Sequence, residues 1–399
     1  MVAVLTSSAG GTSPHRRYRL SIVVTHPIQY FAPWFGQLAD HPQLEMQVIY
    51  LRQLDTEAQG LGFAHSFAWD VPLLDGYTSE TLDAPQQPVA SLRWLPSLAR
   101  ALRAFKPDAV LVTGWQEPLL AAAIPLSRWL GVPVILRGEA NALRSRGLLA
   151  RLAHRAIVAL TAAAVSIGRS NRDFYTKASS GRLPVFDGAY FVENERMLAM
   201  AEAFAGEAAA CRELDGAAAD DVVFTFCGKH VPFKRPDWLV EAAGQLVAEG
   251  MCVRVRFAGS GEMTAQLKAR CAELGVPTHF TGFLNQTEMW RAYIGADVFV
   301  LPSTHRETWG LVVNEAMLFG LPAIVSNEVG CGPDLVRDGE TGWIFAGGLD
   351  GLVDCMRRAV VQRSRLREMG TAAKAHVSQH YSMQVATDGL LQAINAVVK

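Results

Sequence analysis

Residues 300–322, VLPSTHRETWGLVVNEAMLFGLP, decide the fold that we expect for this chain. Residues 298–301 are β-prone and are followed by a break at Pro302, which predicts a buried strand that ends there. After a polar loop comes the run at 311–319, which is too apolar for a surface helix. Gly320 is a typical stop signal at the end of a helix. The stretch therefore predicts a strand, a polar loop and a helix packed among neighbours.

Two carboxylates stand in this unit, with seven residues between them. Eight positions along one helix amount to about 800°, roughly 80° away from the same face, so we expect Glu307 in the loop and Glu315 in the second helical turn. Between them, Gly310, Leu311 and Val312 would present free backbone N–H groups at the helix start, a favourable place for a diphosphate. Each carboxylate would then bind a hydroxyl, and a nucleotide-sugar has hydroxyls on both sides of its diphosphate.

The pattern E-x7-E within PSxxxExxGLxxxEAMxxGxP resembles the retaining glycosyltransferases of family 4, the glycosyl transferases group 1. The resemblance implies an α/β protein with the GT-B fold, in which two Rossmann-like doubly wound domains face each other across a cleft. It also implies that Glu307 holds the donor sugar and Glu315 the ribose, with Ser303 at the donor site. The competing interpretation is a buried helix with an incidental pair of glutamates.

The length of 399 residues favours two domains, and 50% hydrophobic with 19% charged residues is typical of a globular protein. Six scattered cysteines without a CxxC pair indicate reduced thiols and neither a disulfide framework nor a zinc site. No apolar run reaches the roughly 20 residues that span a bilayer. The expected domains are a loose tail at 1–18, an acceptor domain at 19–197, a linker at 198–220, a nucleotide-sugar domain at 221–380 and a returning helix at 381–399.

The first half alternates strand-like and helix-like segments, which predicts a largely parallel sheet. The strands are expected at 19–25, 44–51, 108–114, 133–138 and 163–168. Ligands of such sheets bind at the carboxyl ends of the strands. Polar or aromatic side chains at those ends are therefore acceptor or sugar candidates, and Arg137 is the favoured one because a charge there needs a partner. For His26 and Trp115, a turn histidine and rim packing are equally good interpretations. The candidates are His26, Gln29, Trp115, Arg137 and Glu139.

The second half begins with a strand at 222–227, followed by Gly228, Lys229 and Lys234 in a strand-to-helix turn. By resemblance, Lys229 takes the place of an arginine in the family's G-R-x-x-x-x-K pattern and Lys234 keeps the lysine. Two cations there would neutralise the charge that grows on the leaving diphosphate. A lysine is a point charge and lacks the bidentate fork of arginine, so the geometry of the grip would differ.

Two further turns complete the expected nucleotide site. Gly259 belongs to a G-x-G turn after the strand at 253–258, a weak signal by itself. By resemblance this turn lines the nucleotide, and the turn at Phe283 and Leu284 meets the base through its backbone. Backbone contacts leave the choice among UDP-, GDP- and ADP-sugars open. No metal-ligand cluster appears in the sequence, so we expect no metal and no cofactor other than the donor substrate.

The charge of the chain is unevenly distributed. Residues 91–182 hold fourteen Lys and Arg against four acids, a local net of +10, although the whole chain has a net charge of −1. Two segments of this stretch, 91–105 and 142–160, are amphipathic and basic, so they predict either docking on an anionic membrane or ordinary packing on a sheet. The stretch carries no recognisable nucleic-acid module, and we expect no nucleic acid as a partner.

The resemblance implies a metal-independent retaining transferase that moves a hexose-type sugar to a hydroxyl of a glycan or a lipid-linked acceptor, in polysaccharide or glycoconjugate synthesis. Glu307, Lys234 and Lys229 would be its catalytic residues. We expect a cytoplasmic protein, peripheral on the inner face of the plasma membrane if the basic segments bind lipid. Two alternatives remain open: a GT-B epimerase or hydrolase that acts on the nucleotide-sugar alone, and a non-catalytic module that binds it.

Overall fold

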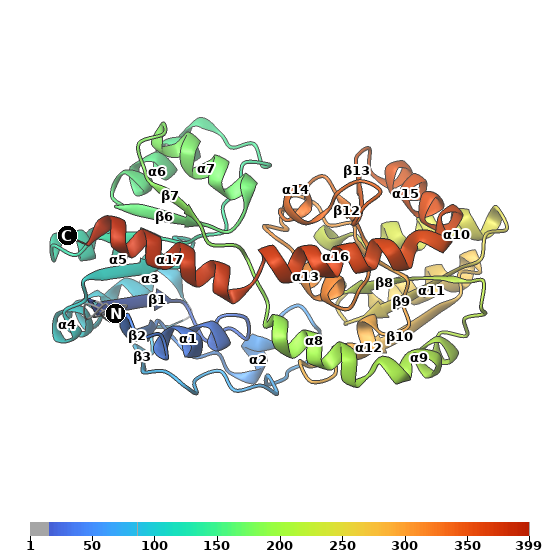
Figure 1. Cartoon of the computed structure of the whole chain (residues 1–399), viewed down its shortest axis with the longest axis horizontal. Coiled ribbons are helices and arrows are strands. Elements are labelled where there is room, and N and C mark those ends of the chain that lie inside the picture. The colour runs from blue at the N-terminus through green and yellow to red at the C-terminus, as the bar shows by residue number, and fades with distance from the viewer. Residues whose placement is uncertain (1–15, 86, 399) are drawn as a thin grey trace, which may run out of the picture.

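The structure is a computed structural model that describes residues 16–85 and 87–398. It has two α/β lobes side by side, joined by a chain that crosses between them twice (Figure 1). The tail expected at 1–18 lies almost entirely outside the described residues. Among those described, no helix is both long and apolar enough to cross a bilayer.

The first lobe is built on a parallel sheet of seven described strands in the order β3-β2-β1-β4-β5-β6-β7. The five strands expected in this half are all present, and β3 and β7 are additional strands at the two edges of the sheet. The strands are β1 (Tyr18–Val24), β2 (Leu44–Tyr50), β3 (Ser79–Thr81), β4 (Ala109–Val112), β5 (Val134–Leu136), β6 (Ala163–Ser166) and β7 (Val185–Asp187). The helices of this lobe are α1 (Ala32–Ala39), α2 (Thr56–Gln59), α3 (Pro88–Ser91), α4 (Leu95–Phe105), α5 (Pro118–Trp129), α6 (Leu148–Ala159) and α7 (Arg169–Ser179).

The second lobe has a parallel sheet of six described strands in the order β10-β9-β8-β11-β12-β13. Its strands are β8 (Val222–Cys227), β9 (Val253–Ala258), β10 (Thr278–Gly282), β11 (Val298–Leu301), β12 (Ala323–Ser326) and β13 (Gly342–Phe345). Its helices are α10 (Pro236–Ala248), α11 (Thr264–Leu274), α12 (Trp290–Tyr293), α13 (Leu311–Leu318), α14 (Gly332–Leu335), α15 (Leu349–Val361) and α16 (Leu366–His380). The strand β13, at one edge of this sheet, was not among the predicted ones.

Helices connect the two lobes in both directions (Figure 1). Going out, α8 (Asn194–Ala203) and α9 (Ala208–Leu214) occupy much of the expected linker. Coming back, α17 (Met383–Val397) follows α16 and packs on β6 and β7 of the first sheet. Gly389 lets it approach closely, since a Cβ there would lie 2.0 Å from the carbonyl oxygen of Asp187. The expected returning helix is therefore present.

The strand order places the crossover points of both sheets at the cleft. In the first sheet the order reverses between β1 and β4, and in the second between β8 and β11. Ligands of open parallel sheets bind in the crevice outside the carboxyl ends of the strands at such a point. The segments that follow β1, β8 and β11 contain His26, Gly228 and Ser303 near their starts, so the topology itself brings these predicted site residues to the cleft.

Candidate functional site

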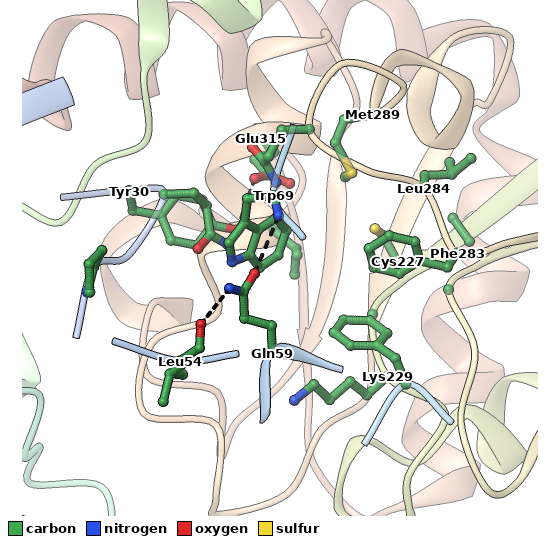
Figure 2. A pocket seen from close by; sticks show the side chains of 18 of the residues that line it. Tyr30, Leu54, Gln59, Trp69, Cys227, Lys229, Phe283, Leu284, Met289 and Glu315 are labelled. Atoms are coloured by element: carbon green, nitrogen blue, oxygen red, sulfur yellow. Dashed lines mark hydrogen bonds between the residues drawn. The ribbon is translucent and has the colours of Figure 1, made fainter. Parts of the chain in front are cut away.

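A cavity of about 350 Å³, which we call the cleft cavity, lies between the two lobes. Figure 2 shows Tyr30, Gln59 and Trp69 from the first lobe on one side, with Lys229, Phe283 and Leu284 from the second lobe opposite them. More than half of the predicted site residues line it. These are His26, Gln29, Gly228, Lys229, Gly259, Phe283, Leu284, Val312 and Glu315.

Glu315 is buried at the inner end of the cleft cavity. It is the fifth residue of α13, in the second turn as expected, and its side chain is 0% exposed. Tyr30 of the first lobe donates to Oε1 at 3.0 Å, and Tyr293 of the second donates to Oε2 at 2.7 Å. Burial raises the pKa of Glu315, although the two tyrosine hydrogen bonds oppose that shift. A carboxylate oxygen has a second lone pair, so each oxygen can still accept from a ligand hydroxyl.

Glu307 lies in the loop before α13 and is paired with Lys234. The Lys234 Nζ is 2.6 Å from Glu307 Oε2, and both side chains are mostly buried. Ser303 also donates to Oε2, at 3.0 Å. Lys234 lies beside the cleft cavity, because a Cβ added to Gly228 would meet its side chain at 3.4 Å. The predicted residues Glu307, Lys234 and Ser303 thus form one hydrogen-bonded group next to the cavity.

Lys229 lines the cleft cavity itself. Its Nζ donates to the carbonyl oxygen of Leu61 at 2.6 Å and lies over the Phe63 ring, 4.9 Å from the centroid. Burial and the neighbouring charge of Lys234 lower the pKa of Lys229. Lys229 and Lys234 are neighbouring cations that repel each other, so an anion bound between them would be favoured.

Glycines bring the backbone of the second lobe close to the cavity. Gly259 has φ +118°, and a Cβ there would lie 2.1 Å from the carbonyl oxygen of Gly228. Gly310 has φ +99° and immediately precedes α13, which begins at Leu311. The N–H groups of Leu311 and Val312 therefore belong to the first helical turn, where no intrahelical acceptor exists. Val312 lines the cavity, whereas Gly310 and Leu311 are not among its lining residues.

A segment of the first lobe at 55–70 closes the cavity from the opposite side. Its aromatic side chains surround Phe283 of the second lobe, with the Phe67 and Phe283 ring centroids 4.3 Å apart and those of Phe63 and Phe283 5.0 Å apart. Asn285 donates to the carbonyl oxygen of Ala68 at 2.7 Å. This segment covers the place where the resemblance puts the nucleotide base.

The remaining acceptor candidates separate into two groups. His26 and Gln29 line the cleft cavity, and burial and then the charge of Arg52 lower the pKa of His26. Trp115 and Glu139 line a second cavity of about 280 Å³, which also includes Thr308. Glu139 accepts from the Thr308 hydroxyl at 2.7 Å, which connects the first lobe to the residue after Glu307.

Arg137 is not brought to this group, which corrects the expectation that made it the favoured candidate. It is 3% exposed, donates to the carbonyl oxygens of Gly188 and Ala189, and lies against the rings of Trp34, Tyr190 and Phe191. Burial lowers its pKa to about 10. Its partners are backbone carbonyls directly after β7, so the charge is compensated within the fold.

Several residues that line the cavity or contact its lining residues were not among the sequence candidates. Tyr30 and Tyr293 hold Glu315, and the segment 55–70 contributes Phe63 and Trp69. A signal for the segment exists in the sequence, because aromatic rings recur at every second position from 63 to 69 in FAHSFAW. Within the described residues, no cluster of His, Cys, Asp and Glu could hold a metal ion.

Comparison with known proteins relates the second lobe to a family. Residues 212–376 match the family model "Glycosyl transferases group 1". A D-inositol 3-phosphate glycosyltransferase of Nocardia farcinica is 33% identical over 203 residues, 48% of this chain and 44% of the relative. A sulfoquinovosyl transferase of Arabidopsis thaliana is 36% identical over 138 residues, 34% of this chain and 26% of the relative. The chain thus covers less than half the length of these curated relatives.

Solved structures show the same fold along nearly the whole chain. The Anabaena protein HepE in complex with UDP and glucose has a TM-score of 0.70 at 14% identity, covering 95% of this chain and 100% of that one. A glycosyltransferase from Rickettsia africae has a TM-score of 0.72 at 12% identity, covering 96% and 99%. The chain has the GT-B fold, and its residues 212–376 match the model of the glycosyl transferases group 1.

Proposed function

We propose that this protein is a retaining glycosyltransferase that moves a hexose-type sugar from a nucleotide-diphosphate sugar to a hydroxyl of a glycan or lipid-linked acceptor. The observation that carries the proposal is the cleft cavity, which combines Lys229, the first turn of α13 and the buried Glu315 around one space. Cations and free N–H groups suit a diphosphate, while a buried carboxylate suits the ribose hydroxyls. This order of groups matches the order along a nucleotide-sugar.

The residues have separate roles in this proposal. Glu315 binds the ribose, Lys229 and Lys234 bind the diphosphate, and Glu307 holds the donor sugar. Lys234 pairs with Glu307 at 2.6 Å, so one hydrogen-bonded group reaches both the sugar and the diphosphate. The base lies by Phe283 and Leu284, beneath the aromatic segment at 55–70. UDP-sugars are the first donors to test, since the structural neighbour HepE is complexed with UDP-glucose.

The chemistry follows from these positions. The bond from the sugar C1 to the diphosphate oxygen breaks, and a bond from C1 to the acceptor oxygen forms on the same face of the sugar. The acceptor proton passes to the leaving diphosphate, and the two lysines stabilise the charge that grows there. Closure of the lobes excludes water that would hydrolyse the donor. The step is proposed without a metal ion, because the two lysines supply the positive charge.

A thermal-shift panel tests the donor site. The wild-type protein and Glu315→Gln are heated with UDP, GDP, ADP and their sugars. We expect one nucleotide series to raise the melting temperature of the wild type and to lose most of that effect in the variant. A panel in which no nucleotide shifts the wild type contradicts the proposal.

A second assay separates transfer from action on the donor alone. Release of nucleoside diphosphate is followed with and without added acceptor sugars. Release that depends on an acceptor supports transfer. Fast release or rearrangement of the donor without any acceptor favours the epimerase or hydrolase instead.

A further inference from the structure

The helix α6 is weakly packed for its length. Of its twelve described residues only Val158 is buried. Leu148 is 62%, Leu149 83% and Leu152 53% exposed, and they stand together at its N-terminal half. The helix lies beside α7 on the outer side of the first lobe (Figure 1). An exposed apolar strip of this kind marks a surface that binds something apolar.

Between α6 and α7 lies a large and strongly cationic groove of about 800 Å³, which we call the basic groove. The residues that line it include five cations and no carboxylate. The cations are Arg144, Arg146, Arg151, Arg155 and Lys177. Such a set binds phosphate far better than it binds a neutral ligand.

The charges of the basic groove are not compensated by the fold. Among the residues that the structure describes, no carboxylate forms an ion pair with Arg144, Arg151, Arg155 or Lys177. Arg146 instead donates to the carbonyl oxygens of Asn141 and Arg144 and lies 5.0 Å from the Phe174 ring centroid. Burial and the charge of Arg144 lower the pKa of Arg146. Positive charge gathered in this way points to an anion from outside the chain.

The other basic segment of the first lobe is an ordinary packed helix. In α4, Leu98 and Leu102 are buried together with Ala99 and Ala101. Its arginines project from the opposite face and line none of the cavities described above. The sequence left open, for both basic segments, whether they pack on the sheet or dock on a membrane. The structure distinguishes them: the segment 91–105 packs on the sheet, and the segment 142–160 leaves leucines exposed.

The basic groove is continuous with the loop of Glu307. Arg144 and Arg146 line both the groove and a neighbouring cavity of about 430 Å³ whose other residues include Arg306 and Thr308. Asn141 crosses the cleft here and donates to the carbonyl oxygen of Thr308 at 3.0 Å. His154 lines the groove and also the small cavity with Trp115 and Glu139. A path lined by cations thus leads from α6 to the proposed site of transfer.

We propose that the basic groove binds the phosphate-bearing headgroup of a lipid-linked acceptor, whose apolar tail lies along Leu148, Leu149 and Leu152. The inference rests on the proposed function, because it names the acceptor of that transfer as an anionic amphiphile. The phosphate contacts Arg144, Arg151 and Arg155, and the hydroxyl-bearing end extends past Asn141 toward Glu307. A small free anion would satisfy the arginines but would leave the leucines exposed.

The test uses the full chain and vesicles of phosphatidylcholine, with and without phosphatidylglycerol. We expect the wild type to sediment with the anionic vesicles alone, and the combined change Arg144→Gln, Arg151→Gln and Arg155→Gln to weaken binding by about tenfold or more. The matched α4 control carries Arg93→Gln just before α4 and Arg100→Gln and Arg103→Gln on it, with the same loss of charge, and should bind like the wild type. Leu149→Ser should weaken binding without any change in charge.

Equal binding by the groove variant and the α4 control overturns the proposal. A second result also overturns it: no vesicle binding by the wild type, together with a rise in melting temperature in inorganic pyrophosphate that the groove variant lacks. The groove would then be a site for a small anion. The nucleotide thermal shift is measured on the same variants. If the groove variant keeps the nucleotide-induced rise in melting temperature but no longer binds vesicles, the groove acts independently of the donor site. If the wild type binds vesicles but shows no nucleotide-induced rise, the proposed function is contradicted and the lipid-binding groove is not.

Discussion

The cleft cavity and the basic groove are both rich in charge, but they differ in where the charge is compensated. In the cleft cavity Glu315 is held by two tyrosines, Lys234 by Glu307 and Lys229 by a carbonyl oxygen. In the basic groove the arginines have no carboxylate partner among the described residues. Compensated groups are fixed in position before a ligand arrives, whereas uncompensated ones attract a ligand from a distance. The first arrangement suits chemistry, and the second suits capture.

The largest expected effect comes from breaking the Glu307 to Lys234 pair. Glu307→Gln removes the carboxylate that accepts from Lys234 at 2.6 Å, so donor turnover should fall by about 10²- to 10³-fold. Release of nucleoside diphosphate measures this, with Glu340→Gln on an exposed ion pair with Arg337 as the control. Turnover that stays at the wild-type level would remove Glu307 from the proposed chemistry.

Removal of the cavity lysine should weaken nucleotide binding. A hydrogen bond to a charged group contributes about 1.5–3 kcal/mol, so Lys229→Met should lower the affinity for a nucleoside diphosphate by roughly tenfold to a hundredfold. Lys268→Met, on the exposed side of α11, is the matched control and should have no effect. If Lys229→Met and Lys268→Met bind the nucleoside diphosphate with the same affinity, Lys229 has no role in the donor site.

The aromatic segment provides a smaller effect. Phe67→Ala removes the ring 4.3 Å from Phe283, and an aromatic pair contributes about 0.5–1.5 kcal/mol, so nucleotide affinity should fall a few-fold. Phe204→Ala removes a similar pair with Trp290, also at 4.3 Å, away from the cavity. Both variants should melt a few degrees earlier, but Phe67→Ala alone should bind nucleotide less well. If the two variants bind nucleotide with identical affinity, the segment at 55–70 does not contribute to the donor site.

The smallest effect concerns pH and Glu315. Burial raises its pKa in the folded state above the ordinary 4.5, so its stabilising contribution is complete below pH 4.5 and is lost as pH rises through the folded pKa. Glu315→Gln removes this dependence. The stability of the variant relative to the wild type should therefore increase from acidic to neutral pH, as thermal melts of both proteins would show. A difference that is constant with pH would mean that Glu315 is not buried as an ionisable group.

The sequence was sufficient for the fold and for much of the cavity. Strands buried on both faces read as continuous apolar runs, which is why β1, β8 and β11 were located closely. Glu307, Lys229 and Lys234 lie in the connections that follow strands, and Glu315 lies early in α13, so the local sequence determines their positions. The elements β3 and β7 were missed because a three-residue edge strand leaves little pattern to detect.

The contacts between the lobes could not be predicted from local sequence. Tyr30 reaches Glu315 across 285 residues, and Lys229 meets Leu61 across 168. Arg137 was misjudged for the same reason, since its carbonyl partners lie 51 and 52 residues away on the chain. Likewise, the two basic segments look alike in sequence, and only the packing of their leucines against neighbouring elements distinguishes them.

Calorimetric titration of UDP, the nucleotide bound by HepE, tests the division of labour between the two regions most directly. The wild type, Lys229→Met and the triple arginine variant of the basic groove are titrated under the same conditions, with GDP and ADP as alternatives. The account predicts that one nucleotide binds the wild type and the groove variant equally well, and Lys229→Met at least about tenfold more weakly. Equal affinity in Lys229→Met, or a comparable loss in the groove variant, would contradict it.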